Sequence, residues 1–234
     1  MKNMINNQLT LGVGLKDDAT FINYYPGNNQ QLVGELRKSA RGEGERVIYF
    51  CSSGGEGCTH LLQACCHEAN LFKRRSVFLP LANLIDFSPD IFEGLESLDL
   101  VCIDDLHRIA GKEHWEEAFF HAYNRIRDAG GRLIVTANVM PKSLGLALPD
   151  VVSRLAWGIA FQMQPLSDEE KLSVLIMRAE RRGMMLSEEV GKFILTHCPR
   201  HMSTLFAALD ALDKVSLAAQ RKLTIPFVKT VLQM

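Results

Sequence analysis

The sequence lacks an excess of positive charge. Its 234 residues include 26 Lys and Arg residues and 27 Asp and Glu residues, for a formal net charge of −1. Proteins that bind phosphate backbones without sequence specificity are usually basic, so this balance argues against bulk nucleic-acid binding. The sequence also has no apolar run of 18 residues, which excludes a membrane-spanning helix.

A signal-peptide pattern is missing too. The apolar part of the N-terminal segment is short, is interrupted by Gly12 and Gly14, and lacks a small-residue cleavage site. Secretory signals need a longer apolar region and such a site. We therefore expect a cytoplasmic protein with no membrane partner.

Cysteine occurs without metal-ligand spacing. None of the six cysteines forms a CxxC pair, and Cys51 and Cys102 lie inside apolar strand-like runs. This pattern favours buried, reduced thiols. A zinc site built from Cys65, Cys66 and His67 is disfavoured because it lacks a second ligand pair.

Short apolar runs alternate with helical patterns in the first two thirds of the chain. Strands are expected at 46–51, 76–81, 99–104, 132–137 and 158–163, and helices near 59–70, 113–128 and 149–156. Strands that are apolar on both faces and alternate with helices are typical of a parallel sheet covered on both sides.

The pattern becomes purely helical after Pro165. Helices are expected near 167–182, 187–198, 202–218 and 225–233. Ser167 and Glu170 have capping-box spacing, Ser187 is a candidate N-cap, and Pro226 suits a first helical turn. These signals predict a small all-helical unit.

We therefore expect three parts. Residues 1–17 are polar, contain Asn and Gly, and are expected to form a flexible arm. Residues 18–164 would form the α/β domain. Residues 165–234 would form the helical domain.

A glycine-rich loop follows the first predicted strand, which is where a phosphate-binding loop occurs. Compared with the pattern G-x-x-x-x-G-K-[ST], Gly57 and Thr59 match, while Ser52 replaces the first Gly and Cys58 replaces the Lys. The backbone amides can still cradle phosphates, but the fixed positive charge is lost. A glycine-rich connection without a ligand is an equal alternative at this point.

Polar residues also end the third and fourth predicted strands. Asp104 and Asp105 end the third, where an acid of a phosphate-loop protein holds Mg²⁺; the alternative is a solvated pair of helix caps. Asn138 follows the fourth and could sense a γ-phosphate, or could simply belong to a turn.

These elements follow the order and spacing of AAA+ ATPases, and the chain resembles the Hda family of DnaA regulatory inactivators. The segments that carry the resemblance are 8–11, 21–28, 59–62, 100–105, 148–158, 164–172 and 220–229. The last three are the most specific. The resemblance implies the AAA+ P-loop fold, with a five-stranded parallel sheet flanked by helices and then a small all-helical lid. The chain stops where DnaA would continue into its DNA-binding domain, so no sequence-specific DNA binding is expected.

The resemblance also implies a function. Hda proteins bind the DNA-loaded sliding clamp, the β subunit of DNA polymerase III, and stimulate hydrolysis of the ATP bound to DnaA, which prevents repeated initiation. Gln8, Leu9 and Leu11 match the clamp-binding pattern, although Gly12 stands where Pro is frequent; by themselves they could be a solvated tail. Arg154 matches the arginine finger that acts in trans.

Without the family context, Arg154 would more simply pair with Asp150 or lie on the surface. A finger instead stabilises charge on the transferring phosphoryl group of a neighbouring active site. The resemblance favours the finger.

The family binds a nucleotide between the α/β domain and the lid. By resemblance the base is bordered by Tyr24, Tyr25 and Pro26, and the phosphates by Gly54, Gly55, Glu56, Gly57, Cys58, Thr59 and His60. Ser203 stands where the lid usually has an Arg, and Arg200 is expected at another helical phase.

Both Cys58 and Ser203 remove positive charge, so a nucleoside diphosphate is expected. ADP is the first candidate, the base is left open, and Mg²⁺ could bind through Thr59 and Asp104. Hydrolysis by the chain itself is expected to be very slow or absent.

Two other functions compete with this regulatory role. An autonomous ATPase, acting as a loader or remodeller, is favoured by Asp104 and Asp105 but disfavoured by the missing Lys and lid Arg. A DNA-tethering adaptor that recruits an initiator is disfavoured by the near-neutral charge. AAA+ surfaces are heterologous and can form filaments or closed pairs, so the oligomeric state is left open and a homo-oligomer is one alternative.

Overall fold

The fold is built on one parallel sheet. The computed structural model describes residues 14–219 and 223–233. Its strands are β1 (Val47–Cys51), β2 (Ser76–Pro80), β3 (Leu100–Asp104), β4 (Arg132–Ala137) and β5 (Ile159–Gln162). All neighbours pair in parallel, in the order β2-β3-β4-β1-β5. The five-stranded parallel sheet is confirmed, and each strand lies within one residue of its expected bounds.

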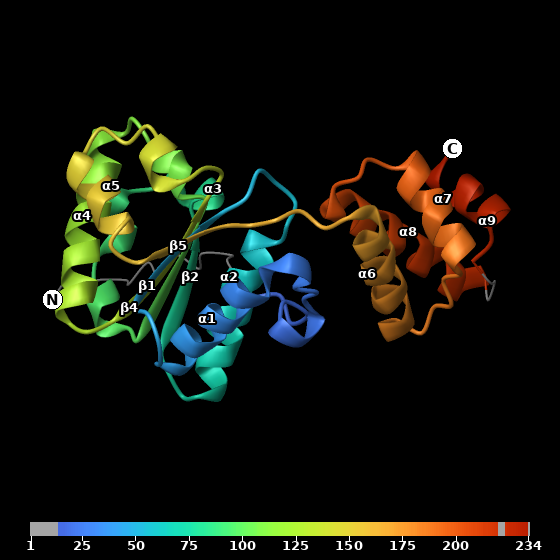
Figure 1. Cartoon of the computed structure of the whole chain (residues 1–234), viewed down its shortest axis with the longest axis horizontal. Coiled ribbons are helices and arrows are strands. Elements are labelled where there is room, and N and C mark those ends of the chain that lie inside the picture. Colours follow the sequence, from blue (N-terminus) through green and yellow to red (C-terminus); the bar gives the residue numbers. More distant parts are fainter. Residues whose placement is uncertain (1–13, 220–222, 234) are drawn as a thin grey trace, which may run out of the picture.

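Helices cover both faces of the sheet (Figure 1). One face carries α1 (Gln30–Arg41) and α2 (Cys58–Leu71), and the other carries α3 (Leu81–Leu84), α4 (Glu113–Asp128) and α5 (Pro149–Leu155). Short 3₁₀ turns fill several connections.

The sequence analysis did not predict α1, although a signal was present. Leu32, Leu36 and Ala40 recur every four residues, and all three are buried. Spacing of this kind places the three side chains along one face of a helix. The helix ends at Gly42, whose φ of 94° closes the turn.

Alternation along the strands sorts side chains between the two faces. In β1, Ile48 and Phe50 join the buried cluster that contacts α1 and α2, while Tyr49 and Cys51 join the cluster beneath α4 and α5. Successive side chains of a strand point to opposite faces. Both faces of β1 are covered, which explains why its sequence is apolar throughout.

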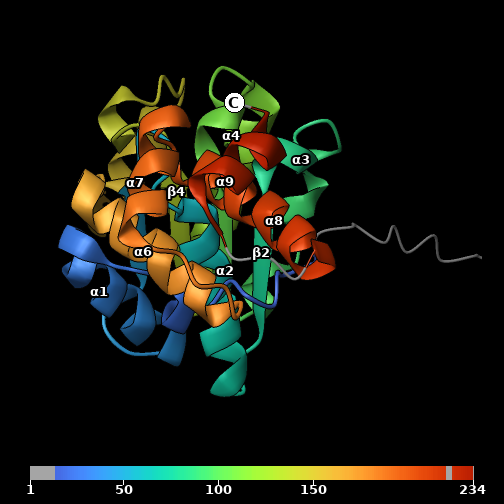
Figure 2. The same cartoon turned by 90° about the vertical axis from the view of Figure 1, so that its right-hand side faces the viewer.

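A helical lid follows the sheet. It contains α6 (Asp168–Arg181), α7 (Glu188–His197), α8 (Met202–Ala219) and α9 (Ile225–Leu232), packed around their own apolar cluster. From the lid side, these helices lie in front of the α/β part (Figure 2). Among residues 165–219 and 223–233 there is no strand.

The predicted helix starts of the lid are confirmed. The Ser167 hydroxyl accepts the Glu170 amide at 3.2 Å, and the Glu170 carboxylate accepts the Ser167 amide at 2.8 Å. Ser187 caps α7 by accepting the amide of Val190. Pro226 lies in the first turn of α9. The division of the chain near residue 164 stays a prediction.

The three clamp-binding candidates, Gln8, Leu9 and Leu11, lie outside the described residues. The part of the chain that precedes α1 is described from residue 14. Its Lys16 donates a backbone hydrogen bond to Gln63 on α2 at 2.8 Å, and the Lys16 carbonyl lies 3.0 Å from a ring nitrogen of His67. No helix within the described ranges is long and apolar enough to cross a membrane.

Candidate functional site

The glycine-rich loop lies at the carboxyl edge of the sheet, between β1 and α2. Gly54, Gly55 and Gly57 have φ values of 130°, 85° and 91°, which residues other than glycine rarely adopt. Gly57 is the N-cap of α2, and a Cβ atom there would lie 3.1 Å from the Tyr24 ring. The loop therefore places backbone amides and the N-terminus of α2 at this edge, in the arrangement that binds anions.

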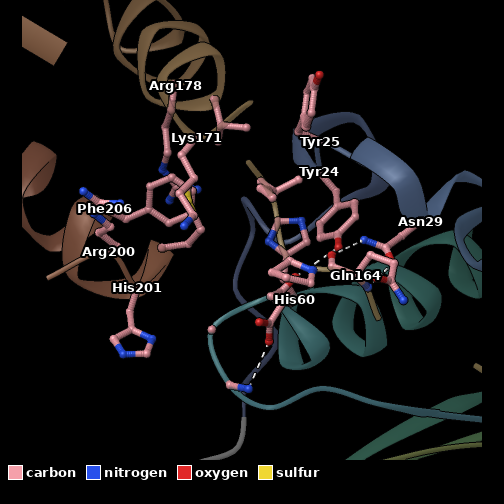
Figure 3. A pocket seen from close by; sticks show the side chains of 18 of the residues that line it. Tyr24, Tyr25, Asn29, His60, Gln164, Lys171, Arg178, Arg200, His201 and Phe206 are labelled. Carbon is pink, nitrogen blue, oxygen red and sulfur yellow. Dashed lines mark hydrogen bonds between the residues drawn. The ribbon is translucent and has the colours of Figure 1, made fainter. Parts of the chain in front are cut away.

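Two cavities share this loop. The first, about 320 Å³ in volume, lies between the loop and the lid (Figure 3). The second, about 580 Å³, continues along the ends of the strands. The first is lined by Tyr24, Tyr25, Gly54, Gly55, Glu56, Gly57 and His60, and the second also by Cys58, Thr59, Asp104, Asn138 and Ser203. The structure thus brings almost all of the predicted nucleotide-site residues to one cleft.

Pro26 is the exception, since it lines neither cavity. Its carbonyl accepts the amide of Asn29 at 2.8 Å within the 3₁₀ turn Gly27–Asn29. The residue shapes the start of α1, and its assignment to the base stays a prediction.

An aromatic wall forms one side of the first cavity. The rings of Tyr24 and His60 lie 5.6 Å apart, tilted by 37°. The Tyr24 hydroxyl donates to the Glu56 carbonyl at 3.0 Å, and His60 Nε2 lies 2.9 Å from the Thr20 carbonyl oxygen. Burial raises the pKa of Tyr24, so the phenol stays protonated. Such a wall suits a planar ring such as a nucleobase.

The strand ends form a polar cluster around a buried carboxylate. The Thr59 hydroxyl donates to Asp104 Oδ2 at 2.6 Å, and the Thr136 hydroxyl donates to Asp104 Oδ1. Burial raises the pKa of Asp104, while the two hydroxyl donors oppose that rise. The pair expected to hold Mg²⁺, Thr59 and Asp104, is therefore assembled.

A magnesium ion fits this pair only with help from other oxygens. Mg²⁺ takes oxygen ligands and usually keeps several waters or phosphate oxygens. No group of three or more His, Cys, Asp or Glu side chains suited to a metal occurs in the described ranges. Thr59 and Asp104 would thus supply two protein ligands to an ion that also binds a nucleotide.

Cys58 contributes no positive charge at the loop. Its Sγ lies 3.4 Å from Sδ of Met163. Burial raises the pKa of the thiol to about 12, so it is neutral near pH 7. The six cysteines of the chain are free, as expected. Only four of them are buried, because Cys58 and Cys198 are half-buried.

The lid supplies cations that the sequence analysis missed. Lys171, Arg178 and Arg200 line the first cavity, on the side opposite Tyr24 and His60 (Figure 3). The cleft therefore carries positive charge from the lid although Cys58 and Ser203 contribute none. Lys171 and Arg178 are seven residues apart on α6, a spacing that places them on one helix face and could have revealed them.

Arg200 also differs from expectation. It precedes α8, which begins at Met202, so it is not a helical residue at another phase. Its guanidinium pairs with Asp168 at 2.7 Å, and the amine of Lys171 lies 3.6 Å from the same carboxylate. Two of the three lid cations therefore share one acid at the start of α6.

Arg154 lies away from this cleft, on α5. Its guanidinium carbon is 4.9 Å from the ring centre of Phe120, 5.8 Å from that of Tyr123 and 5.5 Å from that of Trp157. Nε and Nη1 are buried without a hydrogen-bond partner among the described residues. The alternative considered from the sequence, an ion pair between Arg154 and Asp150, does not form among the described residues.

Two family models match successive parts of the chain. The model of the bacterial DnaA ATPase domain matches residues 87–162. The model described as the Hda lid domain matches residues 168–232. The first match includes β3 to β5 with α4 and α5, and the second includes the four lid helices.

Solved structures with a similar fold include two DnaA proteins and a motor protein. Domain III of Thermotoga maritima DnaA superimposes with a TM-score of 0.80 at 22% identity, over 94% of this chain and 98% of that one. AMPPCP-bound DnaA from Aquifex aeolicus gives 0.72 at 22% identity, over 87% and 67%. The Holliday junction branch migration motor RuvB of Thermotoga maritima gives 0.64 at 13% identity, over 87% and 68%. These likenesses confirm the predicted AAA+ fold.

Proposed function

The chain is a DnaA-related AAA+ protein with an Hda-type lid, and we propose that it regulates the initiation of chromosome replication. In this proposal it binds a nucleoside diphosphate, meets the sliding clamp and ATP-bound DnaA in the cytoplasm, and stimulates hydrolysis of the ATP on DnaA. In this step Arg154 completes the ATP-hydrolysing site of DnaA.

The state of Arg154 carries this proposal. A guanidinium has five N–H donors, and leaving buried donors unpaired is unfavourable. Nε and Nη1 of Arg154 are buried without a partner within the described ranges, and three aromatic rings hold the group in place. Once the side chain turns outward from these rings, phosphate oxygens of a neighbouring nucleotide would satisfy these donors, as expected of an arginine finger.

The neighbouring aromatic residue supports an interface at this position. Trp157 follows α5 and is 69% exposed, although large aromatic side chains are usually covered. Aromatic and Arg side chains are enriched where proteins meet. Arg154 and Trp157 together suit contact with a second AAA+ subunit, which could be DnaA or a copy of this chain.

The nucleotide cleft has a supporting role in the proposal. An adenine nucleotide is favoured because a DnaA relative is described as AMPPCP-bound. Tyr24 and His60 would border the base, and the amides from Gly54 to Gly57 would face phosphates. A nucleotide that contacts both this loop and the lid would hold the two parts in a defined orientation.

The loop argues against rapid turnover by the chain itself. Cys58 remains neutral, and Ser203 lines the second cavity with a hydroxyl. The Mg²⁺ expected at Thr59 and Asp104 would neutralise phosphate charge when bound. Without the loop Lys, we expect the chain to keep a diphosphate and not to cycle through hydrolysis.

The remaining part of the proposal concerns the clamp. Gln8, Leu9 and Leu11 would insert into an apolar pocket of the β subunit, with the Gln amide hydrogen-bonded. This contact would bring the chain to DNA that carries a loaded clamp. Binding of the clamp to a Leu9→Ala, Leu11→Ala variant tests this step directly.

The decisive experiment measures hydrolysis of DnaA-bound ATP in the presence of clamp loaded on DNA. The wild-type chain should accelerate it, and Arg154→Ala should remove most of that acceleration while clamp binding persists. In related systems a trans-acting finger contributes about 10³–10⁵ in rate. Arg154→Lys should restore little, because the planar guanidinium makes paired contacts that an amine cannot.

Arg127→Ala is the matched control, since Arg127 lies near the end of α4 and pairs with the adjacent Asp128. It should stimulate hydrolysis like the wild type. Equal stimulation by wild type and Arg154→Ala would refute the finger. Absence of stimulation by the wild type at saturating clamp would refute the regulatory function as a whole.

A second candidate is an autonomous ATPase. The Thr59–Asp104 pair favours it, because a metal ligand pair is in place. Turnover of ATP by the isolated chain that is lost in Asp104→Asn would support this function. Its absence, with stimulation of DnaA intact, would leave the regulatory function alone.

A further inference from the structure

The charges around the cleft are unevenly distributed. The second cavity is lined by four carboxylates, Asp18, Asp104, Asp105 and Asp210, and by two cations, Lys16 and Arg178. The first has one carboxylate, Glu56, and three cations, Lys171, Arg178 and Arg200. An anionic ligand that reaches from the aromatic wall toward the strand ends therefore needs a cation common to both cavities, and Arg178 is the one residue of the described chain that meets this need.

Arg178 is held over the cleft by packing. Its guanidinium carbon lies 4.1 Å from the ring centre of Phe206 on α8. Stacking on an aromatic ring fixes the plane of a guanidinium and leaves its edge free for hydrogen bonds. Arg178 and Phe206 lie together on the lid side, across the cleft from His60 (Figure 3). The positive charge of Arg178 also reaches His60: burial lowers the pKa of that imidazole, and Arg178 lowers it further.

The hydrogen bonds of Arg178 are incomplete. Nη2 contacts Asp18 Oδ2 at 3.0 Å, and Nε is buried without a partner among the described residues. The Asp18 side chain is 57% exposed, so water competes for it. A ligand oxygen could replace Asp18 at one edge of the guanidinium and satisfy Nε as well.

The other two lid cations are less available. Lys171 and Arg200 both pair with Asp168 at the start of α6, and neither lines the second cavity. Lys16 lines the second cavity, but its side chain is exposed, and within the described ranges no aromatic ring lies against it to orient it. Orientation matters because a guanidinium that is already held in one plane loses less conformational freedom when it binds a phosphate.

We propose that Arg178 binds the terminal phosphate of a nucleoside diphosphate and takes the place of the missing loop Lys. When no phosphate is present, Asp18 pairs with the guanidinium and keeps it at the cleft. The positive charge for the phosphates thus comes from α6 of the lid, and nucleotide binding draws the lid toward the loop. This inference rests on the nucleotide binding in the proposed function and names the residue that carries it.

The experiment compares binding of ADP and AMP to the full chain by titration calorimetry. The wild type should bind ADP more tightly than AMP. Arg178→Gln should lose about tenfold to hundredfold in ADP affinity, the range for a hydrogen-bonded charge, with AMP affinity unchanged. Arg178→Lys should keep part of the preference for ADP. Asp18→Asn should strengthen ADP binding, because it removes the carboxylate that competes for Arg178.

Arg200→Gln is the matched control, since Arg200 lines the first cavity and already pairs with Asp168. It should change ADP affinity by less than Arg178→Gln. Thermal unfolding of each variant reports whether the lid is intact. If Arg178→Gln binds ADP like the wild type, or loses ADP and AMP equally, this inference is overturned. A wild type that binds neither nucleotide overturns the nucleotide part of the proposed function along with it.

Discussion

The carboxylate of Glu56 accepts hydrogen bonds from the backbone amide of Gly54, at 3.0 Å, and from the hydroxyl of Ser52. A negatively charged side chain of the phosphate loop thus already uses donors of the same loop. The same Ser52 hydroxyl also accepts the Gly54 amide at 3.0 Å. Amides of such loops usually face the phosphates of a ligand. Here an incoming phosphate meets a negative charge that already uses one of these donors.

Replacing Glu56 with Gln should therefore strengthen ADP binding. The Gln carbonyl can still accept the Gly54 amide, but the repulsion between the carboxylate and the phosphates is gone. We expect about a tenfold gain in affinity, which is about 1.4 kcal/mol. Titration of ADP into wild type and variant measures it. Glu45→Gln, at an exposed residue before β1, changes the net charge equally and should leave affinity as it is.

A second prediction concerns the buried carboxylate at the end of β3. Burial raises the pKa of Asp104, because it destabilises the charged carboxylate relative to the same group in the unfolded chain. Asp104→Asn should raise the free energy of unfolding of the nucleotide-free chain by about 1 kcal/mol, or about 2–4 °C in Tm. The gain should shrink as the pH falls through the raised pKa of Asp104 toward the ordinary value of 3.8, below which the carboxyl is protonated in the folded and the unfolded chain alike.

The same substitution should weaken the effect of Mg²⁺ on ADP binding, because a ligand oxygen loses its charge. Asp99→Asn serves as the control, since Asp99 precedes β3 and contacts Arg75 near the surface. It should alter neither Tm nor the Mg²⁺ effect appreciably. A destabilised Asp104→Asn chain would contradict the reasoning on the buried charge.

A third prediction follows from the lowered pKa of His60. Burial is the largest cause of this shift from the ordinary value of 6.5. As the pH falls through 6.5, the unfolded chain binds a proton that the folded chain does not, so the free energy of unfolding decreases. His60 contributes at most about 1.4 kcal/mol per pH unit, the limit for one proton.

Urea unfolding between pH 7.5 and 5.5 measures this slope. His60→Gln should flatten it, because the titrating group is removed while an N–H donor for the Thr20 carbonyl is kept. His114→Gln, at an exposed residue of α4, should retain the wild-type slope. An unchanged slope in His60→Gln would assign the pH dependence to other groups.

A fourth prediction concerns the connection between β5 and the lid. Asn29 is 6% exposed and binds the backbone of Gln164 twice: its Nδ2 donates to the carbonyl at 2.9 Å, and its Oδ1 accepts the amide at 2.8 Å. Asn29→Ala leaves both backbone groups without these partners. The loss should cost about 2–3 kcal/mol in the free energy of unfolding.

Denaturant unfolding checks this value, and hydrogen exchange at the Gln164 amide should accelerate in the variant. Asn28→Ala is the neighbouring control, because Asn28 is exposed. Equal stability of the two variants would show that the Gln164 contact does not hold the connection.

Much of the fold could be predicted because its signals are local. The alternating apolar runs located all five strands, and Ser167 with Glu170 marked the start of the lid. The helix α1 was missed, since its few apolar residues, such as Leu32 and Leu36, are separated by polar ones. Its polar remainder resembles a loop until the buried face is recognised.

The sequence by itself determined the order of the five strands and of the four lid helices along the chain, the glycine positions of the loop, and the loss of the Lys at Cys58, because each depends on neighbouring residues alone. Only the tertiary structure decided the charge of the cleft. Arg178 is 120 residues from Cys58, and only the packing of the lid brings α6 to the loop. Likewise the unpaired donors of Arg154 and the carboxylate of Glu56 in the loop depend on burial and side-chain direction, which three-dimensional packing sets.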